Sequence, residues 1–150
     1  MPPASSTNSS RESSAVEDYL EKILELIDNK GYARVADLAE ALGIAQPSVS
    51  NMMRRLDAKG LLRHEKYRGV TLTATGEKLA RRITKRHEML AEFLELMGID
   101  ADTAYRDLEG MEHHISSQTL RGIEQLIEEL HGDGEMRDRI RSATAESDEL

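Results

Sequence analysis

The sequence predicts a mainly α-helical protein with one small two-stranded hairpin, and three observations lead to this fold class. Apolar residues recur at helical spacing along most of the 150 residues. Two short strand-like runs, LLRHEK and GVTLT, flank a turn at residues 67–69. Aromatic residues make up only 3% of the chain, so the core must be built from aliphatic side chains.

Three helices are predicted before the hairpin. The first runs from an N-cap at Ser14 to a stop at Gly31, because the apolar residues between them fall on one helical face. A short second helix covers residues 35–43, and Pro47 begins a third helix that ends near Gly60. A small residue in the second helix is followed by a glycine and then by an apolar residue in the third helix. The distances between them in the sequence are typical of a helix-turn-helix. An ordinary helical hairpin has the same pattern, so these residues alone do not decide between the two.

The hairpin that follows favours a winged helix-turn-helix, because this fold has the order helix, helix, helix, hairpin. Gly69 provides the positive φ that the turn needs. The hairpin carries Arg63, Lys66 and Arg68, which suits a wing lying along a phosphate backbone. Charged residues also protect exposed edge strands, and this is the structural alternative. We expect double-stranded DNA as the partner of this half of the chain.

The net charge of −8 is unevenly distributed along the chain. Residues 46–86 carry 11 basic and 3 acidic side chains, whereas residues 1–45 and 87–150 have net charges of −4 and −12. A local basic stripe attracts phosphate whatever the total charge is. The start of the third helix is predicted to meet base edges in the major groove through Gln46, Pro47, Ser48, Ser50, Asn51 and Arg54. Phosphate contacts are predicted for Arg55, Arg63, Lys66 and Arg68.

Three more helices are predicted after the hairpin. A long one is capped by Thr73 or Thr75, a short one covers residues 102–115, and the last begins at Ser116 or Ser117. The last helix has an apolar stripe that must be buried within the chain or against a second copy of it.

Several classes of protein are excluded by what the sequence lacks. There is no cysteine, hence no disulfide, thiolate metal site or cysteine nucleophile, which fits a cytoplasmic protein. No apolar run approaches the roughly 20 residues of a membrane span, and the start of the chain lacks the apolar core of a signal peptide. Residues 1–14 and 142–150 are polar and are predicted to be disordered tails.

Carboxylates and imidazoles cluster in EGMEHH at residues 109–114. On a helix, Glu109, Glu112 and His113 have the spacing i, i+3 and i+4 and point the same way. The first helix places Asp18 and Glu21 on one face in the same manner. Each cluster taken alone is also typical of a solvated polar face.

Five segments together resemble the manganese transport regulators, the short branch of the diphtheria toxin repressor family. They are EDYLEKI at 17–23, GYARVADLAEALG at 31–43, LTATGEKLA at 72–80, RHEML at 86–90 and EGMEHHIS at 109–116. The resemblance covers about residues 15–130. It implies a winged-helix DNA-binding domain at 15–75 and an all-helical metal-binding and dimerisation domain at 76–141. Because only about 20 residues follow the last predicted helix, we expect no further barrel domain of the kind found in the larger family members.

The resemblance also implies a function and a ligand set. By position in the motifs, the metal ligands are Asp18, Glu21, His87, Glu109, Glu112 and His113, holding two Mn(II) ions per subunit with Glu109 or Glu112 as a bridge. Metal held by both domains is expected to fix a homodimer in the geometry that reads a palindromic operator. The chain would then repress genes of manganese uptake.

The choice of Mn(II) has a chemical argument beside the resemblance. Iron-sensing relatives place a sulfur residue where this chain has Glu112, and a set of only carboxylates and imidazoles suits Mn(II). Fe, Co, Cd and Zn are expected to bind in vitro, because affinity order alone favours several of them. An iron-responsive regulator therefore remains an alternative.

Two other functions explain only part of the sequence. A metallohydrolase could use a dinuclear site, but the sequence has no glycine-rich phosphate loop and no nucleophile arrangement, and the wing would be unexplained. A metal-independent winged-helix regulator would leave the EGMEHH cluster unexplained. We expect a regulator that is not an enzyme and has no small-molecule substrate.

Overall fold

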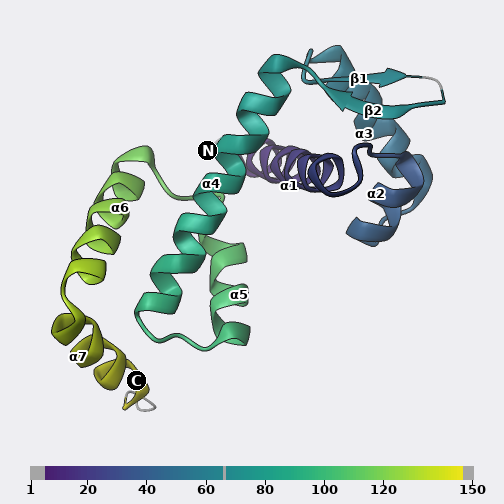
Figure 1. Cartoon of the computed structure of the whole chain (residues 1–150). Helices are drawn as coiled ribbons and strands as arrows, with labels where there is room; N and C mark the ends of the chain where they lie inside the picture. Colours follow the sequence, from purple (N-terminus) through teal and green to yellow (C-terminus); the bar gives the residue numbers. More distant parts are fainter. Residues whose placement is uncertain (1–5, 66, 147–150) are drawn as a thin grey trace, which may run out of the picture. The chain divides into compact units, whose positions relative to one another are not determined.

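The computed structural model describes residues 6–65 and 67–146, with side chains from residue 12 onward. The chain divides into two compact units, called unit 1 and unit 2, with the border between Thr84 and Lys85. This border lies inside helix α4 (Ala74–Leu96), the longest described helix after α1 (Ser6–Lys30). Figure 1 shows the course of the chain through its elements.

Unit 1 has the predicted order of elements. After α1 come α2 (Val35–Leu42), α3 (Gln46–Ala58), β1 (Leu62–Glu65), β2 (Gly69–Leu72) and the first part of α4. Pro47 lies in the first turn of α3, where its missing N–H costs no hydrogen bond. The prediction of a winged helix-turn-helix is therefore confirmed.

The core of unit 1 joins all its helices to the hairpin. Side chains without exposed surface include Leu20, Leu38, Val49, Met53 and Val70. Val70 comes from β2 and the others from the apolar faces that helical spacing predicts, and their burial holds α2 and α3 in place against α1. The outer face of α3 is thereby left to solvent.

The hairpin is attached to the rest of unit 1 through the backbone. The strands β1 and β2 pair antiparallel, from Leu62 opposite Leu72 to Glu65 opposite Gly69. The N–H of Val70 donates to the carbonyl of Ala33 at 2.6 Å. Gly69 has a φ of +83°, and a Cβ there would lie 2.4 Å from the Ala33 carbonyl oxygen. Glycine is required at this position both by conformation and by space.

Unit 2 is helical throughout its described residues. The remainder of α4 is followed by α5 (Ala101–Met111), α6 (Ser117–Gly132) and α7 (Gly134–Ala145). Each of these three helices has a side-chain cap, and the cap residues are Asp100, Ser116 and Asp133. The hydrogen bond from the Thr103 N–H holds the pKa of the Asp100 carboxyl below its usual value. The core of unit 2 is aliphatic and gathers around Leu90.

Three predicted boundaries differ from the structure. Helix α1 begins at Ser6 and not after Ser14, so residues 6–14 are helical where a disordered tail was expected. Helix α5 ends at Met111, before the predicted end at 115. Helix α7 was not predicted, because its polar sequence has only weak apolar periodicity, and it makes 142–145 helical as well. Residues 1–5 and 147–150 lie outside the described residues.

Within the described chain, no helix combines the length and apolar content that crossing a membrane requires.

Candidate metal centre and DNA-contact surface

Glu112 is the central residue of the candidate metal centre in unit 2. It follows the last residue of α5 as its C-cap, with its N–H donating to the Leu108 carbonyl at 3.0 Å. Its side chain is only 3% exposed, the one charged side chain that is buried among the described residues. Buried carboxylates are rare in proteins unless they are paired or coordinate a metal.

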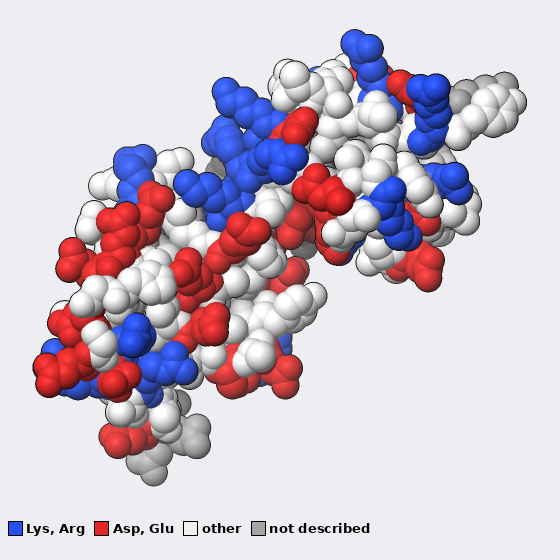
Figure 2. All heavy atoms as spheres, viewed as in Figure 1, with Lys and Arg blue, Asp and Glu red and all other residues white. Residues whose placement is uncertain are grey.

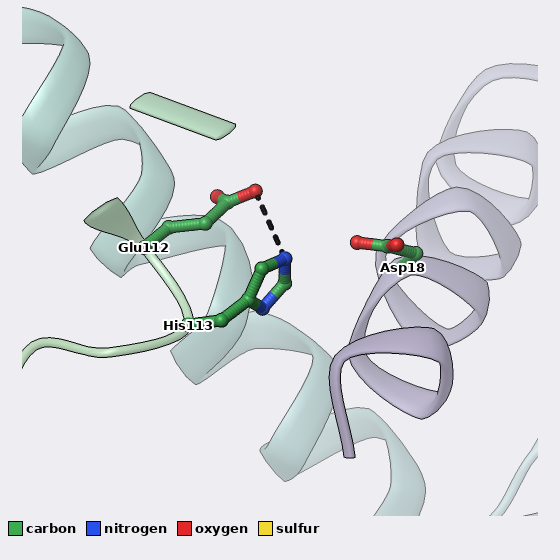
Figure 3. Close-up of side chains that lie close together, drawn as sticks. All are labelled: Asp18, Glu112 and His113. Carbon is green, nitrogen blue, oxygen red and sulfur yellow. Dashed lines mark ion pairs between the residues drawn. The ribbon is translucent and has the colours of Figure 1, made fainter. Parts of the chain in front are cut away.

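Two imidazoles lie beside the Glu112 carboxylate. The Nδ1 atom of His87, on α4, is 2.9 Å from Oε2 of Glu112. The Nε2 atom of His113 is 3.5 Å from Oε1, the contact drawn as a dashed line in Figure 3. Each carboxylate oxygen therefore faces a different imidazole. A carboxylate with this arrangement can ligate one cation through each oxygen.

The prediction that Glu109, Glu112 and His113 share one face of a helix is only partly correct. Helix α5 ends at Met111, so His113 lies in the following turn and not on the helical face that carries Glu109. The Glu109 side chain is exposed. Its role as a ligand stays a prediction.

The ligand-type residues of the described chain fall in both units. Among the described His, Asp and Glu side chains that could hold a metal ion, unit 1 contains Asp18 and Glu21, and unit 2 contains His87, Glu112 and His113. Glu109 does not belong to these groups. Asp18 and Glu21 lie one turn apart on α1, and Figure 3 includes Asp18 on this helix. The ligand roles of all six residues stay predictions.

The predicted DNA-contact residues lie on α3 and on the hairpin of unit 1. Most are exposed: Gln46, Pro47, Ser48, Asn51, Arg54, Arg55, Arg63 and Arg68. Ser50 is half-buried and so less accessible, and Lys66 lies outside the described residues. Exposure of the face opposite the core is what reading a major groove requires. The roles of the individual residues stay predictions.

The two units differ in net charge: unit 1, with the predicted DNA-contact residues, is slightly basic, and unit 2, with the candidate metal centre, is acidic. Unit 1 has 13 Lys and Arg against 11 Asp and Glu, whereas unit 2 has 7 against 17. In Figure 2, acidic side chains predominate over the part formed by α5, α6 and α7. Unit 2 is therefore the part with the stronger attraction for cations.

Two contacts near the DNA-contact surface were not found by the sequence analysis. The guanidinium of Arg34 lies 4.6 Å from the ring centroid of Tyr32. The carboxylate of Glu12 forms an ion pair with Arg55 on α3. The polar sequence of residues 1–14 predicts a disordered tail that includes Glu12, so only a helical signal across residues 6–14 would indicate this contact.

An exposed recognition helix with a wing, together with a helical unit that buries a carboxylate between imidazoles, defines a metal-responsive DNA-binding regulator. Two family models support this class. The iron dependent repressor N-terminal DNA binding domain matches residues 13–70, and the iron dependent repressor metal binding and dimerisation domain matches residues 73–139. The chain belongs to this family of transcriptional repressors and is not an enzyme.

Two curated transcriptional regulators are similar to this chain over most of its length. The chain is 49% identical over 114 residues to the HTH-type transcriptional regulator MntR of Lysinibacillus sphaericus (strain C3-41), covering 76% of this chain and 82% of that protein. It is 42% identical over 128 residues to the regulator of the same name from Bacillus subtilis (strain 168), covering 85% and 90%.

Solved structures with a similar fold include two manganese regulators. The structure of the manganese regulator SloR matches with a TM-score of 0.67 and 27% identity, and the crystal structure of ScaR with bound Zn²⁺ matches with a TM-score of 0.65 and 28% identity. Each match covers 75% of this chain and 53% of the other, so the chain spans about half the length of these two proteins.

Proposed function

We propose that this chain is an Mn(II)-activated repressor that binds the operators of manganese homeostasis genes. The observation that supports this function best is the buried Glu112 carboxylate, 3% exposed and flanked by the imidazoles of His87 and His113. A divalent cation would compensate the buried negative charge, which neutral imidazoles do not. The MntR relatives and the manganese regulator structures support Mn(II) as that cation.

The donor atoms fit Mn(II). Carboxylate oxygens and imidazole nitrogens are hard to borderline ligands, and the chain has no cysteine that would select a softer metal. Because raw affinity favours Zn(II) and Cu(II) at such sites, selectivity depends on geometry and on the metal available. Fe(II) is the closest competitor on this chemistry.

The proposed ligands are Asp18, Glu21, His87, Glu109, Glu112 and His113, for two ions per subunit. Glu112 is the better candidate for the bridge, because its two oxygens face different imidazoles, whereas Glu109 is exposed. A metal ion held by side chains of both units would restrict their relative motion. The bound metal supplies positive charge among several carboxylates that otherwise repel one another.

The DNA-binding form is a homodimer in the cytoplasm, where promoter DNA is accessible. The dimerisation domain of the family supports two copies, and two recognition helices at a fixed separation match a palindromic operator. Coupling between metal and DNA then means that Mn(II) favours the dimer geometry that fits both half-sites.

The test is DNA binding by fluorescence anisotropy at fixed salt, on promoter fragments of the organism's own manganese transporter genes. The protein is measured metal-free, with Mn(II), and with Mn(II) after Glu112→Gln. Glu135→Gln on α7 removes one carboxylate charge from the same unit and is the control. We expect tight binding only with Mn(II), lost in Glu112→Gln and kept in Glu135→Gln.

Two results would contradict the proposal. Equal binding with and without metal would leave a winged-helix regulator that does not use metal. Activation by Fe(II) and not by Mn(II), each at matched free concentration under anaerobic conditions, would make the chain an iron-responsive regulator.

A further inference from the structure

The first turns of α1 bring an acidic side chain to the recognition helix. Glu12 precedes Val16, Tyr19 and Ile23 by 4, 7 and 11 residues, so it continues the α1 face that packs into the core of unit 1. This face lies against the rest of unit 1, where Tyr19 is 5% exposed and Ile23 fully buried. The position of Glu12 follows from this packing.

Glu12 contacts two basic residues at α3. Its Oε1 atom forms an ion pair with Nη2 of Arg55, and Nζ of Lys59, the C-cap of α3, is 4.0 Å from the same oxygen. All three side chains are about half exposed, at 44%, 49% and 51%. The group is therefore on the surface and open to an incoming anion.

Arg55 is one of the residues predicted to contact DNA phosphate, and a carboxylate already occupies its guanidinium in the free protein. A carboxylate and a phosphate use the same N–H donors and the same positive charge. Arg55 cannot give its full charge to phosphate while Glu12 remains in place. DNA must displace Glu12 or leave Arg55 and Lys59 partly neutralised.

We propose that Glu12 is an internal competitor for DNA phosphate, which weakens the affinity of α3 for DNA by neutralising Arg55 and Lys59. This inference rests on the DNA-binding part of the proposed function and does not depend on the metal. Because exposed ion pairs are weak, the competition adjusts affinity and does not switch it off. Its effect falls on sequence-independent binding, since phosphate contacts carry no base information.

The competition predicts a direction that the loss of a structural contact would not. Removing Glu12 should tighten DNA binding, by about two- to five-fold at low salt, the range that an exposed ion pair allows. It should also steepen the dependence of log K on log salt by about one, because an additional phosphate contact releases a counterion. If Glu12 instead held Arg55 in the orientation needed for DNA, its removal would weaken binding.

The experiment compares Glu12→Gln with Glu25→Gln in the full chain. Glu25 is exposed on the same helix and pairs with Lys22 at 2.7 Å, so this control removes the same charge from α1 without touching α3. Binding to a fluorescent 30-base-pair duplex of random sequence is measured by anisotropy over a series of salt concentrations. Circular dichroism confirms that both variants keep the wild-type helix content.

Tighter binding and a steeper salt slope in Glu12→Gln alone would support the proposal. A further requirement is that Glu12→Gln has no effect in a chain that already carries Arg55→Gln and Lys59→Gln. Equal changes in Glu12→Gln and Glu25→Gln would reduce the effect to net charge and overturn the proposal, as would weaker binding in Glu12→Gln.

The random duplex separates this test from the one for the proposed function. A series without metal and a series with Mn(II) are both run. A chain without any Mn(II) response would contradict the proposed function and would leave the comparison of Glu12→Gln with Glu25→Gln intact. Conversely, an operator response to Mn(II) with no effect of Glu12 would overturn only the competition.

Discussion

Unit 1 and unit 2 are both mainly helical, but they differ in how completely they bury their apolar surface. Nine of the fourteen buried residues in the described core of unit 1 have no exposed area, whereas in the described core of unit 2 only Leu90 of seven reaches 0%. Both units also leave large hydrophobic side chains exposed, Tyr67 at 90% in unit 1 and Tyr105 at 64% and Leu126 at 51% in unit 2, so the difference lies in their cores. The difference fits a DNA-binding domain that is complete in one chain and a metal-binding and dimerisation domain that is not.

The largest expected effect compares a buried side chain of unit 1 with an exposed apolar side chain of unit 2. Leu38→Ala in unit 1, at 0% exposure, should lower the free energy of unfolding by about 2–5 kcal/mol, because it leaves a cavity that the neighbours cannot fill. The matched change Leu126→Ala in unit 2, at 51% exposure, should change it by less than about 0.5 kcal/mol in dilute protein. Urea unfolding followed by circular dichroism measures both, and a larger loss in Leu126→Ala would contradict the comparison.

The second prediction concerns the candidate metal centre of unit 2. His113 contacts Glu112 at 3.5 Å, while the neighbouring His114 is exposed. His113→Ala should reduce the gain in DNA affinity on adding Mn(II) by roughly 5- to 150-fold, the usual range of coupling between two ligands, because an imidazole ligand is lost. His114→Ala should keep the wild-type gain. Anisotropy titrations with Mn(II) compare the two, and similar losses in both variants would remove His113 from the proposed ligands.

In the third prediction, the same substitution, Gly→Ala, lowers stability in unit 1 and raises it in unit 2. A Cβ on Gly76, at the start of α4, would lie 1.7 Å from the Leu61 carbonyl oxygen, so Gly76→Ala should destabilise by about 1–3 kcal/mol or more. A Cβ on Gly122, on α6, would have no described atom within 4 Å apart from its chain neighbours and the backbone of its own helix, so Gly122→Ala should stabilise by about 0.4–1 kcal/mol. Thermal unfolding of both variants gives the signs. Stabilisation by Gly76→Ala would show that α4 and the loop before β1 are not in close contact.

The smallest expected effect concerns a helix start in unit 2. The Ser116 hydroxyl accepts a hydrogen bond from the Thr119 N–H at 3.2 Å, and Ser116→Ala should lower stability by about 1 kcal/mol. Ser116→Thr keeps the acceptor and should retain most of the stability. Urea unfolding of the two variants is the measurement, and equal losses would mean that the cap does not contribute.

Much of the fold could be predicted from the sequence, because its signals are local. The helical spacing of apolar residues, Pro47 at the start of α3 and Gly69 in the wing each act within a few residues, and the predicted elements of unit 1 follow from them. A cap at Ser116 or Ser117 was predicted for the same reason, and the structure has it at Ser116. Helix α7 has no comparable local signal, since its apolar residues are few.

The types of residue in the candidate site could also be predicted, but not all their surroundings. The resemblance of EGMEHH and RHEML to family motifs predicts carboxylate and imidazole ligands for a metal, whereas each cluster alone is also typical of a solvated polar face. The sequence predicted neither the exposure of Glu109 nor the end of α5 at Met111. The prediction assumed that ideal helical spacing continues past Met111. Where a helix ends depends on the packing around its last turn as well as on its own residues.

By itself, the sequence determined the winged-helix order, the basic segment at 46–86 and the kinds of ligand atom that this protein can offer to a cation. Only the tertiary structure decided that His87 lies 2.9 Å from Glu112, 25 positions further along the chain, and that Glu12 pairs with Arg55, 43 positions further. The physical reason is the range of the interactions. Periodicity and caps act over a few residues, whereas the burial of a carboxylate and the pairing of distant charges depend on how whole helices pack.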